Sequence, residues 1–277
     1  MSITITQLNP QVAQLTSNIN KSQYDLINIA RKKMYADWVA PNDNKFILYK
    51  SIWSDYQMIT YVLSSIYDLN GVDFNSLYCI LRSMLEKYAD FVNLVIYGEK
   101  YMSYLEYLHK NSLFQATKNE EYKKLEKKFL QETKENFKGK NRYFNRKSRY
   151  YLIKDFEKDY LFSEMNNQIP LQIINMVKNF NNRLCDLDSE YSQIIHNNLT
   201  PLIFYGNNNA SQKATDIIKK AHCIMFVSSY LFRELYCKDM WYVSNNINYS
   251  MYQDMWNVLN QIYNVFNVNS VCVYRNF

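Results

Sequence analysis

Apolar residues recur at spacings of three and four along most of the chain, which is the pattern of helices that bury one face. Capping side chains and isolated glycines mark the ends of these helices, as at Ser22, Asp73 and Gly98. The pattern predicts helices over about 22–38, 45–69, 73–97, 99–116, 118–137, 163–196 with a break near Pro170, 201–205, 211–237 and 250–267. We therefore expect an all-α multi-helix bundle, formed as one domain over 1–277 with core segments of about 45–117 and 160–267.

Composition supports this fold class and excludes several functions. The 277 residues include only four glycines and four prolines, too few for the turns of an all-β fold. The glycines stand alone at Gly71, Gly98, Gly139 and Gly206. No glycine-rich loop can therefore cradle a phosphate, and the Rossmann, P-loop, kinase and nucleophile-elbow signatures are all absent.

The cysteines and histidines give little sign of a metal site. Five cysteines form no CxxC pair and stand among apolar neighbours, at Cys79, Cys185, Cys223, Cys237 and Cys272. We expect buried thiols, with no metal and no cofactor. His109 is assigned no catalytic role, and His222 is expected to be buried or at the edge of the core. No apolar run approaches the ~18 residues of a membrane span, so we expect a cytoplasmic protein.

Positive charge is concentrated in the segment 118–159, which is expected to form a basic helical excursion from the core. It holds 14 Lys and Arg against 8 Asp and Glu, and the difference, 14 − 8 = +6, equals the net charge of the whole chain. Its aromatic residues include Phe137, Tyr143, Phe144, Tyr150 and Tyr151. Cations that neutralise phosphate, with rings between them that stack on bases, suit single-stranded RNA. The candidate RNA-binding residues are Lys138, Lys140, Arg142, Arg146, Lys147 and Arg149. A solvated excursion is the alternative.

Two polar stripes are candidates for chemistry. On the predicted helix 73–97, Arg82 and Glu86 lie one turn apart at the edge of a broad apolar arc. An ordinary surface ion pair is the alternative there. On the predicted helix 163–196, a narrow polar stripe contains Asn181, Cys185, Asp188, Ser192 and His196, whereas Arg183 points about 140° away from His196.

The junction after His196 adds a candidate phosphate site. The helix is expected to end near His196, and Thr200-Pro201 begins a new helix whose first amides point back toward the junction. A histidine at a helix C-terminus is stabilised in its protonated form, which suits general acid catalysis. A histidine that only caps its own helix is the alternative.

Leu81-Arg82-Ser83-Met84-Leu85-Glu86, followed by Tyr191-Ser192-x-x-x-His196-Asn197, resembles a bacterial family of all-helical proteins with R-x-x-x-E and S-x-x-x-H motifs. That arrangement is similar to the HEPN (higher eukaryotes and prokaryotes nucleotide-binding) superfamily, and the resemblance covers about residues 45–200. HEPN proteins are helical, often dimeric, and frequently metal-independent ribonucleases of toxin and anti-phage systems. Their signature places Arg four to six residues before His, so here Arg82 would replace the distant Arg183.

The resemblance implies a reaction and partners. His196 would move a proton at the 2′-hydroxyl or the leaving 5′-oxygen, and Arg82 would neutralise charge on the phosphate oxygens. Glu86 would hold Arg82, while Ser192 or Asn197 would orient the imidazole or the phosphate. We expect an RNA-binding effector of a defence or toxin system, with a protein partner and a homodimeric state that pairs two sites. The alternative is a non-enzymatic helical interaction module or subunit of a defence complex.

Overall fold

The computed structural model describes residues 10–36, 43–65, 68–139, 144–153, 171–195 and 210–236. Within these residues every regular element is a helix and no strand occurs, which confirms the predicted all-α class. The chain divides into two compact units (residues 1–85 with 188–277, and residues 86–187). The second unit is thus inserted into the first, and it contains the basic excursion predicted at 118–159.

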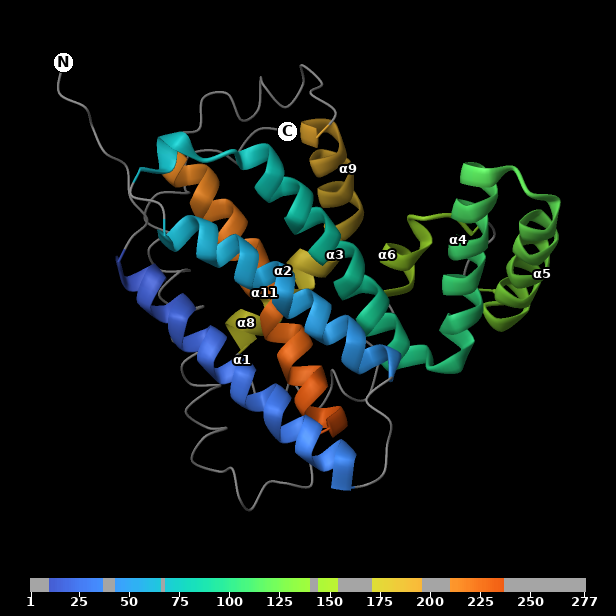
Figure 1. Ribbon diagram of the computed structural model, residues 1–277, viewed down its shortest axis with the longest axis horizontal. Coiled ribbons are helices and arrows are strands. Elements are labelled where there is room, and N and C mark those ends of the chain that lie inside the picture. The colour runs from blue at the N-terminus through green and yellow to red at the C-terminus, as the bar shows by residue number, and fades with distance from the viewer. Residues whose placement is uncertain are drawn as a thin grey trace. The chain divides into compact units, whose positions relative to one another are not determined.

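The first unit is built around three long helices. These are α1 (Pro10–Ala36), α2 (Asn44–Ser65) and α11 (Ala210–Tyr236), and α11 contacts both of the others (Figure 1). The short turn of 3₁₀ helix η1 (Leu69–Gly71) follows α2 and also contacts α11. Residues Ala221 to Arg233 of α11 are all buried, so this helix forms the centre of the first unit.

Polar side chains cross this core in two layers, each with one residue from each helix. In one layer the Tyr49 hydroxyl donates to Gln23 Oε1, and the Ser229 hydroxyl lies 2.9 Å from the same oxygen. In the other, the hydroxyl of Tyr56 lies 3.0 Å from His222 Nε2 and also bonds to Thr16. Buried polar groups of this kind are stable only when they are paired with one another.

The two layers share one register. The residues of each helix are seven apart in sequence, as Thr16 and Gln23, Tyr49 and Tyr56, and His222 and Ser229. Seven residues are close to two helical turns, so each helix presents both of its polar residues on one face. The order of the pairs makes α2 antiparallel to α1 and α11.

The hydrogen bonds of His222 fix its tautomer. Its Nδ1 lies 2.8 Å from the carbonyl of Ile218, which only accepts, so Nδ1 carries the proton. Nε2 therefore accepts from the Tyr56 hydroxyl at 3.0 Å. Burial lowers the pKa of His222 to about 4, because the charged imidazolium would lose its hydration. The imidazole is neutral, which fits the prediction that His222 is a core residue.

The second unit contains a helical hairpin. Its two helices are α4 (Glu99–Thr117) and α5 (Glu120–Asn136), which run antiparallel (Figure 1). Hydrogen bonds join them from Asn111 to Glu126 and from Asn136 to Ser103. The turn between them depends on Asn119, whose side chain accepts from the backbone N–H of Glu121 at 2.9 Å as an N-cap.

A short segment, 144–153, lies against the hairpin and contains α6 (Ser148–Leu152). Side chains from outside the segment donate hydrogen bonds to its backbone carbonyls. Three donors are tyrosine hydroxyls, from Tyr97 to Leu152 at 3.1 Å, from Tyr104 to Asn145 at 2.8 Å and from Tyr107 to Phe144 at 3.2 Å. The fourth is the Asn93 amide, which donates to Arg149 at 2.8 Å. The carbonyls of Asn145 and Arg149 also accept a backbone N–H from within the segment. Residues 144–153 are therefore held in place by side chains of α4 and of the helix that precedes it in the chain.

Two helices connect the units along the chain. They are α3 (Phe74–Tyr97), which crosses from the first unit into the second at Glu86, and α9 (Leu184–Ile195), which returns to the first unit at Asp188. The helix α8 (Leu171–Asn182) precedes α9 within the second unit. Gly98 ends α3 with a φ of 55° and donates its N–H to Leu94, which confirms the predicted stop.

Two predicted boundaries are wrong. The first helix begins at Pro10, so Ser22 lies inside it and does not cap it. Polar Thr16 and Gln23 occupy core positions of this helix, which hid its apolar stripe. The predicted helix 163–196 is interrupted at Arg183, between α8 and α9. Residues 163–170 and the predicted helices 201–205 and 250–267 lie outside the described residues.

The cysteines do not share one environment. Cys223 is buried as predicted, and burial raises the pKa of its thiol to about 12, so it stays protonated. The prediction is wrong for Cys79, which is exposed near the start of α3, and Cys185 is only half-buried. Cys237 and Cys272 lie outside the described residues.

Candidate functional site

The polar stripes of α3 and α9 meet within the first unit. Arg82 Nε donates to Asp188 Oδ1 at 2.9 Å, and the two side chains are 17% and 5% exposed. Each of these residues belongs to one of the stripes identified from the sequence. The stripes therefore face each other, and the partner that the structure gives to Arg82 is Asp188.

A ring contact fixes the direction of the two helices around this pair. The rings of Tyr78 and Tyr191 lie 5.7 Å apart between centroids. Since Tyr78 precedes Arg82 while Tyr191 follows Asp188, α3 and α9 run antiparallel here. Arg82 thus lies about two turns from the last residue of α9, Ile195, or roughly 10 Å along the axis.

The remaining residues of the candidate catalytic set are placed differently. Ser192 lies one turn beyond Asp188 on α9 and is half-buried. His196 and Asn197 follow α9 directly but lie outside the described residues. The approach of Arg82 to His196 stays a prediction.

Glu86 belongs to an ion cluster of the second unit. One carboxylate oxygen accepts from Arg146 Nη2, and the other lies 3.5 Å from Arg149 Nη1. The role predicted for Glu86 was to hold Arg82. That role stays a prediction, and the partners that the structure gives to Glu86 are two arginines of the basic segment.

Asp90 and Arg149 form the centre of this cluster. Arg149 Nη1 donates to Asp90 Oδ2 at 3.0 Å, and the Tyr101 hydroxyl donates to Asp90 Oδ1 at 2.7 Å. Burial raises the pKa of the Asp90 carboxyl, and Arg149 opposes that rise. Burial alone would lower the pKa of Arg149, but Asp90 and the nearby tyrosines raise it above its usual range. The guanidinium therefore stays charged.

This placement changes the candidate RNA surface. Arg149 is only 7% exposed and is held by Asp90 and Glu86, so it does not reach an RNA backbone, and its predicted role is corrected. Arg146 has a side chain that is 56% exposed, although it pairs with Glu86. Lys138 and Lys147 are exposed. Lys140 and Arg142 lie outside the described residues.

The aromatic residues of the same segment mostly serve the core. Phe137, Phe144 and Tyr150 are all buried, whereas Tyr151 is 50% exposed. Tyr143 lies outside the described residues. A ring stacks on a base only when its face is accessible. Of the five aromatic residues named as candidates, Tyr151 is therefore the described one whose ring is exposed for base stacking, and the lysines can contribute only phosphate contacts.

Sequence reasoning missed the role of two carboxylates. Asp188 was recognised as a member of the polar stripe but was not paired with Arg82, and Asp90 was not singled out at all. Asp90 follows Glu86 by one turn on α3, so the two carboxylates share one helix face next to an apolar arc. That spacing is a signal for an arginine partner, but it does not tell which arginine.

The described residues suggest no metal centre and no membrane segment. Over these ranges, three or more His, Cys, Asp or Glu side chains nowhere gather closely enough to hold a metal ion. No helix within them combines the length and the apolar character that crossing a bilayer requires. No protein-family model, curated protein or solved structure matches the chain.

Proposed function

We propose that the protein acts on RNA as an HEPN-like effector of a bacterial defence or toxin system. The observation that supports this proposal is the pairing of Arg82 with Asp188. A composite site requires the polar stripes of α3 and α9 on facing helices, because Arg82 stands on one and the other leads directly into His196.

The proposed chemistry is RNA cleavage by transesterification. The 2′-oxygen attacks the adjacent phosphorus, the 5′-oxygen leaves, and the product is a 2′,3′-cyclic phosphate. His196 takes the proton of the 2′-hydroxyl or gives one to the 5′-oxygen. Arg82 neutralises charge that develops on the phosphate oxygens.

Asp188 is a positioning residue in this scheme. Because it binds Nε, the nitrogen nearest to the aliphatic part of Arg82, it fixes the plane of the guanidinium. Ser192 stands between Asp188 and His196, where its hydroxyl can orient the imidazole. Lys138 and Lys147 contribute contacts to RNA phosphates on the second unit.

The deciding experiment incubates the purified chain with total RNA in EDTA and assays for 2′,3′-cyclic phosphate ends. We expect such ends with the natural chain and none with His196→Ala. The matched control is His109→Ala, because His109 is exposed on α4 and belongs to neither polar stripe. Equal loss of cyclic ends in both variants, or cleavage that persists in His196→Ala, would contradict the assignment.

A second candidate function is supported by the ion pairs themselves. Arg82, Glu86 and Arg149 each pair with an oppositely charged side chain in the structure. Such pairs suit a non-enzymatic helical interaction module, in which the polar residues fix the packing of the helices.

Stability separates the two functions. If His196 is catalytic, His196→Ala abolishes cleavage and leaves the melting temperature within about 2 °C. If it is structural, the same substitution lowers the melting temperature, and no RNA cleavage is found in either chain. Light scattering of the natural chain at several concentrations tests the proposed homodimer separately.

A further inference from the structure

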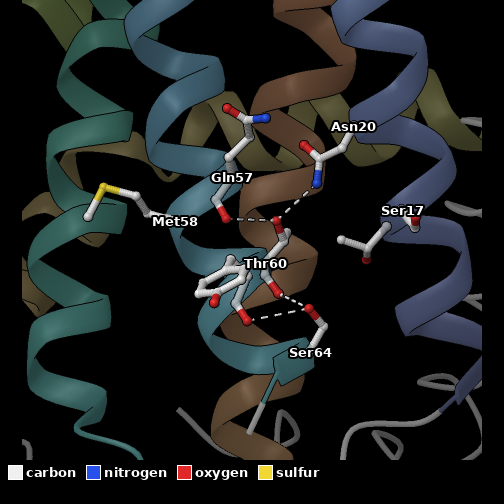
Figure 2. A pocket seen from close by; sticks show the side chains of 8 residues that line it. Ser17, Asn20, Gln57, Met58, Thr60 and Ser64 are labelled. Carbon is white, nitrogen blue, oxygen red and sulfur yellow. Dashed lines mark hydrogen bonds between the residues drawn. The ribbon is translucent and has the colours of Figure 1, made fainter.

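The helices α1 and α2 form a groove within the first unit. It has a volume of about 460 Å³, and all of its lining residues come from these two helices, among them Ser17, Gln57 and Ser64. Figure 2 shows Asn20 pointing from α1 toward Thr60 of α2, to whose hydroxyl its amide donates at 3.2 Å. Because Thr60 is buried, this bond joins the two helices at the floor of the groove.

The walls of the groove follow the register of the two helices. Seven residues are close to two helical turns, so a wall position recurs at that spacing. The wall positions are Ser17, Tyr24 and Arg31 on α1, and Lys50, Gln57 and Ser64 on α2. Each of them is at least partly exposed. Because the helices are antiparallel and Asn20 meets Thr60, Arg31 and Lys50 stand at one level, about three turns farther along.

Positive charge dominates this pair of helices. Together α1 and α2 contain six Lys and Arg but only two carboxylates, Asp25 and Asp55. Helical periodicity turns Asp25 about 100° away from Tyr24, and Asp55 about 140° away from Lys50. Neither helix therefore presents a carboxylate on the walls, whereas Arg31 and Lys50 face each other across one end of the groove.

Large side chains that are usually found in cores are exposed on the same face. Tyr24 is 57% exposed on α1, and Tyr61 and Met58 are 72% and 52% exposed on α2. Tyr61 and Met58 also line the groove. Tyrosine, methionine and arginine are the residue types that are enriched where proteins bind one another. Exposed apolar surface beside cations indicates a site for a protein partner.

The floor of the groove fits the side chains of a helix better than a nucleic acid backbone. The Ser64 hydroxyl donates to the Thr60 carbonyl at 2.6 Å, and the Thr60 hydroxyl donates to the Tyr56 carbonyl at 2.8 Å. Both donors are satisfied within α2, so an apolar side chain above them leaves neither unpaired. An RNA strand would bring a phosphate with every nucleotide, and the floor offers no cation to meet it. Walls that repeat every seven residues match the spacing at which a third helix packs.

We propose that this groove binds an acidic amphipathic helix of a partner protein. Apolar side chains of that helix pack on the floor and against Tyr24 and Tyr61, and its carboxylates lie between Arg31 and Lys50. The distance from Ser17 to Arg31 along α1 is about 20 Å, which corresponds to roughly four turns of a bound helix. The proposal goes beyond the RNA-acting function and does not depend on cleavage, since the groove shares no residue with the polar stripes of α3 and α9.

The test uses Tyr61→p-benzoylphenylalanine, a photo-crosslinking substitution, in the full chain expressed in its own host cells. Mass spectrometry of the crosslinked product identifies the bound peptide. We expect a peptide of another protein, with apolar residues at helical spacing and Asp or Glu beside them. The same substitution at Tyr151, which is 50% exposed on α6, is the control and should not capture that peptide. A crosslink to RNA or to a second copy of this chain, a peptide without the acidic helical pattern, or no product overturns the proposal.

Charge reversal then tests the acidic end. The identified peptide is synthesised and titrated against the full chain. We expect Arg31→Glu with Lys50→Glu to weaken binding roughly tenfold or more. Arg31→Gln with Lys50→Gln, which adds no negative charge, should weaken it less. Lys32→Glu with Lys124→Glu is the matched control, because both lysines are exposed and neither is a wall position.

A peptide with Lys in place of its carboxylates completes this test. It should bind the Arg31→Glu, Lys50→Glu chain more tightly than the original peptide does, which also shows that this variant is folded. Equal losses in the wall variant and in the control variant, or no preference of the wall variant for the Lys peptide, overturn the proposal.

Discussion

Arg82 and Asp188 are 106 residues apart in sequence, and a hydrogen bond of 2.9 Å joins Nε of one to Oδ1 of the other. The pair links the N-terminal half of α3 to the part of α9 that lies in the first unit. Because Asp188 is almost fully buried, its charge depends on Arg82 for compensation. The same bond supports the proposed catalytic site and the structural alternative, and substitutions distinguish the two.

Removing the charge of Asp188 tests that dependence. We expect Asp188→Asn to destabilise the first unit by about 2 kcal/mol, because Arg82 loses a buried anionic partner. Asp186→Asn is the control, since Asp186 is exposed on the same helix, and its effect should stay within about 0.5 kcal/mol. Urea unfolding monitored through amide exchange of α11 gives the measurement. A similar effect of the two substitutions would show that the Arg82 pair contributes nothing specific.

The Asp90 and Arg149 pair should control the order of the segment 144–153. Asp90→Asn leaves Arg149 buried beside a neutral amide and removes the strongest partner of its guanidinium. We expect a cost of about 3 kcal/mol, confined to the second unit. Hydrogen exchange should therefore accelerate in residues 144–153 while α11 keeps its protection. Glu135→Gln, on the exposed face of α5, serves as the control and should leave both regions unchanged.

RNA binding should depend on the exposed lysines of the basic segment. Replacing Lys138 and Lys147 with Gln should reduce the slope of log affinity against log salt by about 1.4, at about 0.7 for each lost contact to single-stranded phosphate. Lys21 and Lys32 are exposed on α1, and the same replacements there are the control. Filter binding over a range of salt concentrations measures both. An unchanged slope in the first variant would assign this surface to solvent or to a protein partner.

Acid should destabilise the first unit through His222. Its folded pKa of about 4 lies below the ordinary value of 6.5, so below pH 6.5 the unfolded chain binds a proton that the folded chain does not. The contribution is fully present above pH 6.5 and is lost as the pH falls toward 4, by about 3 kcal/mol in total. His222→Gln removes this titration. The difference in unfolding free energy between the two chains should therefore change between about pH 7 and about pH 4.5, and a constant difference would refute the assignment.

The helices that the sequence predicted best are those with apolar cores and clear ends. The helix expected at 73–97 is observed at Phe74–Tyr97, because a continuous apolar arc and Gly98 define it locally. The first helix, observed at Pro10–Ala36, was predicted only from residue 22. The reason is that Thr16 and Gln23 occupy core positions where the helical pattern calls for apolar residues. Thr16 and Gln23 can be buried because they form hydrogen bonds with Tyr56 and Tyr49, which lie on another helix.

For the candidate site too, the sequence predicted local features but not the contacts between helices. Helical periodicity placed Arg82 and Asp188 on polar stripes, because that information is local. The partner of each arginine depends on contacts between distant segments, which one sequence does not contain. Arg149 illustrates this, because exposed and buried arginines look alike in a basic stretch, and only Asp90 on another helix explains why this one is buried.

Because the first unit is formed by two separate stretches of sequence, its helices are synthesised at well-separated times. Tyr49 and Ser229 contact each other across 180 residues of chain. At roughly 5–20 residues per second, a ribosome adds α11 about 10 to 35 s after α2. During that interval all of residues 86–187 are synthesised. The polar side chains of α1 and α2 meanwhile lack their hydrogen-bond partners Ser229 and His222. The N-terminal helices are thus exposed to chaperones and proteases for the longest time, although they later pack around α11 in the first unit.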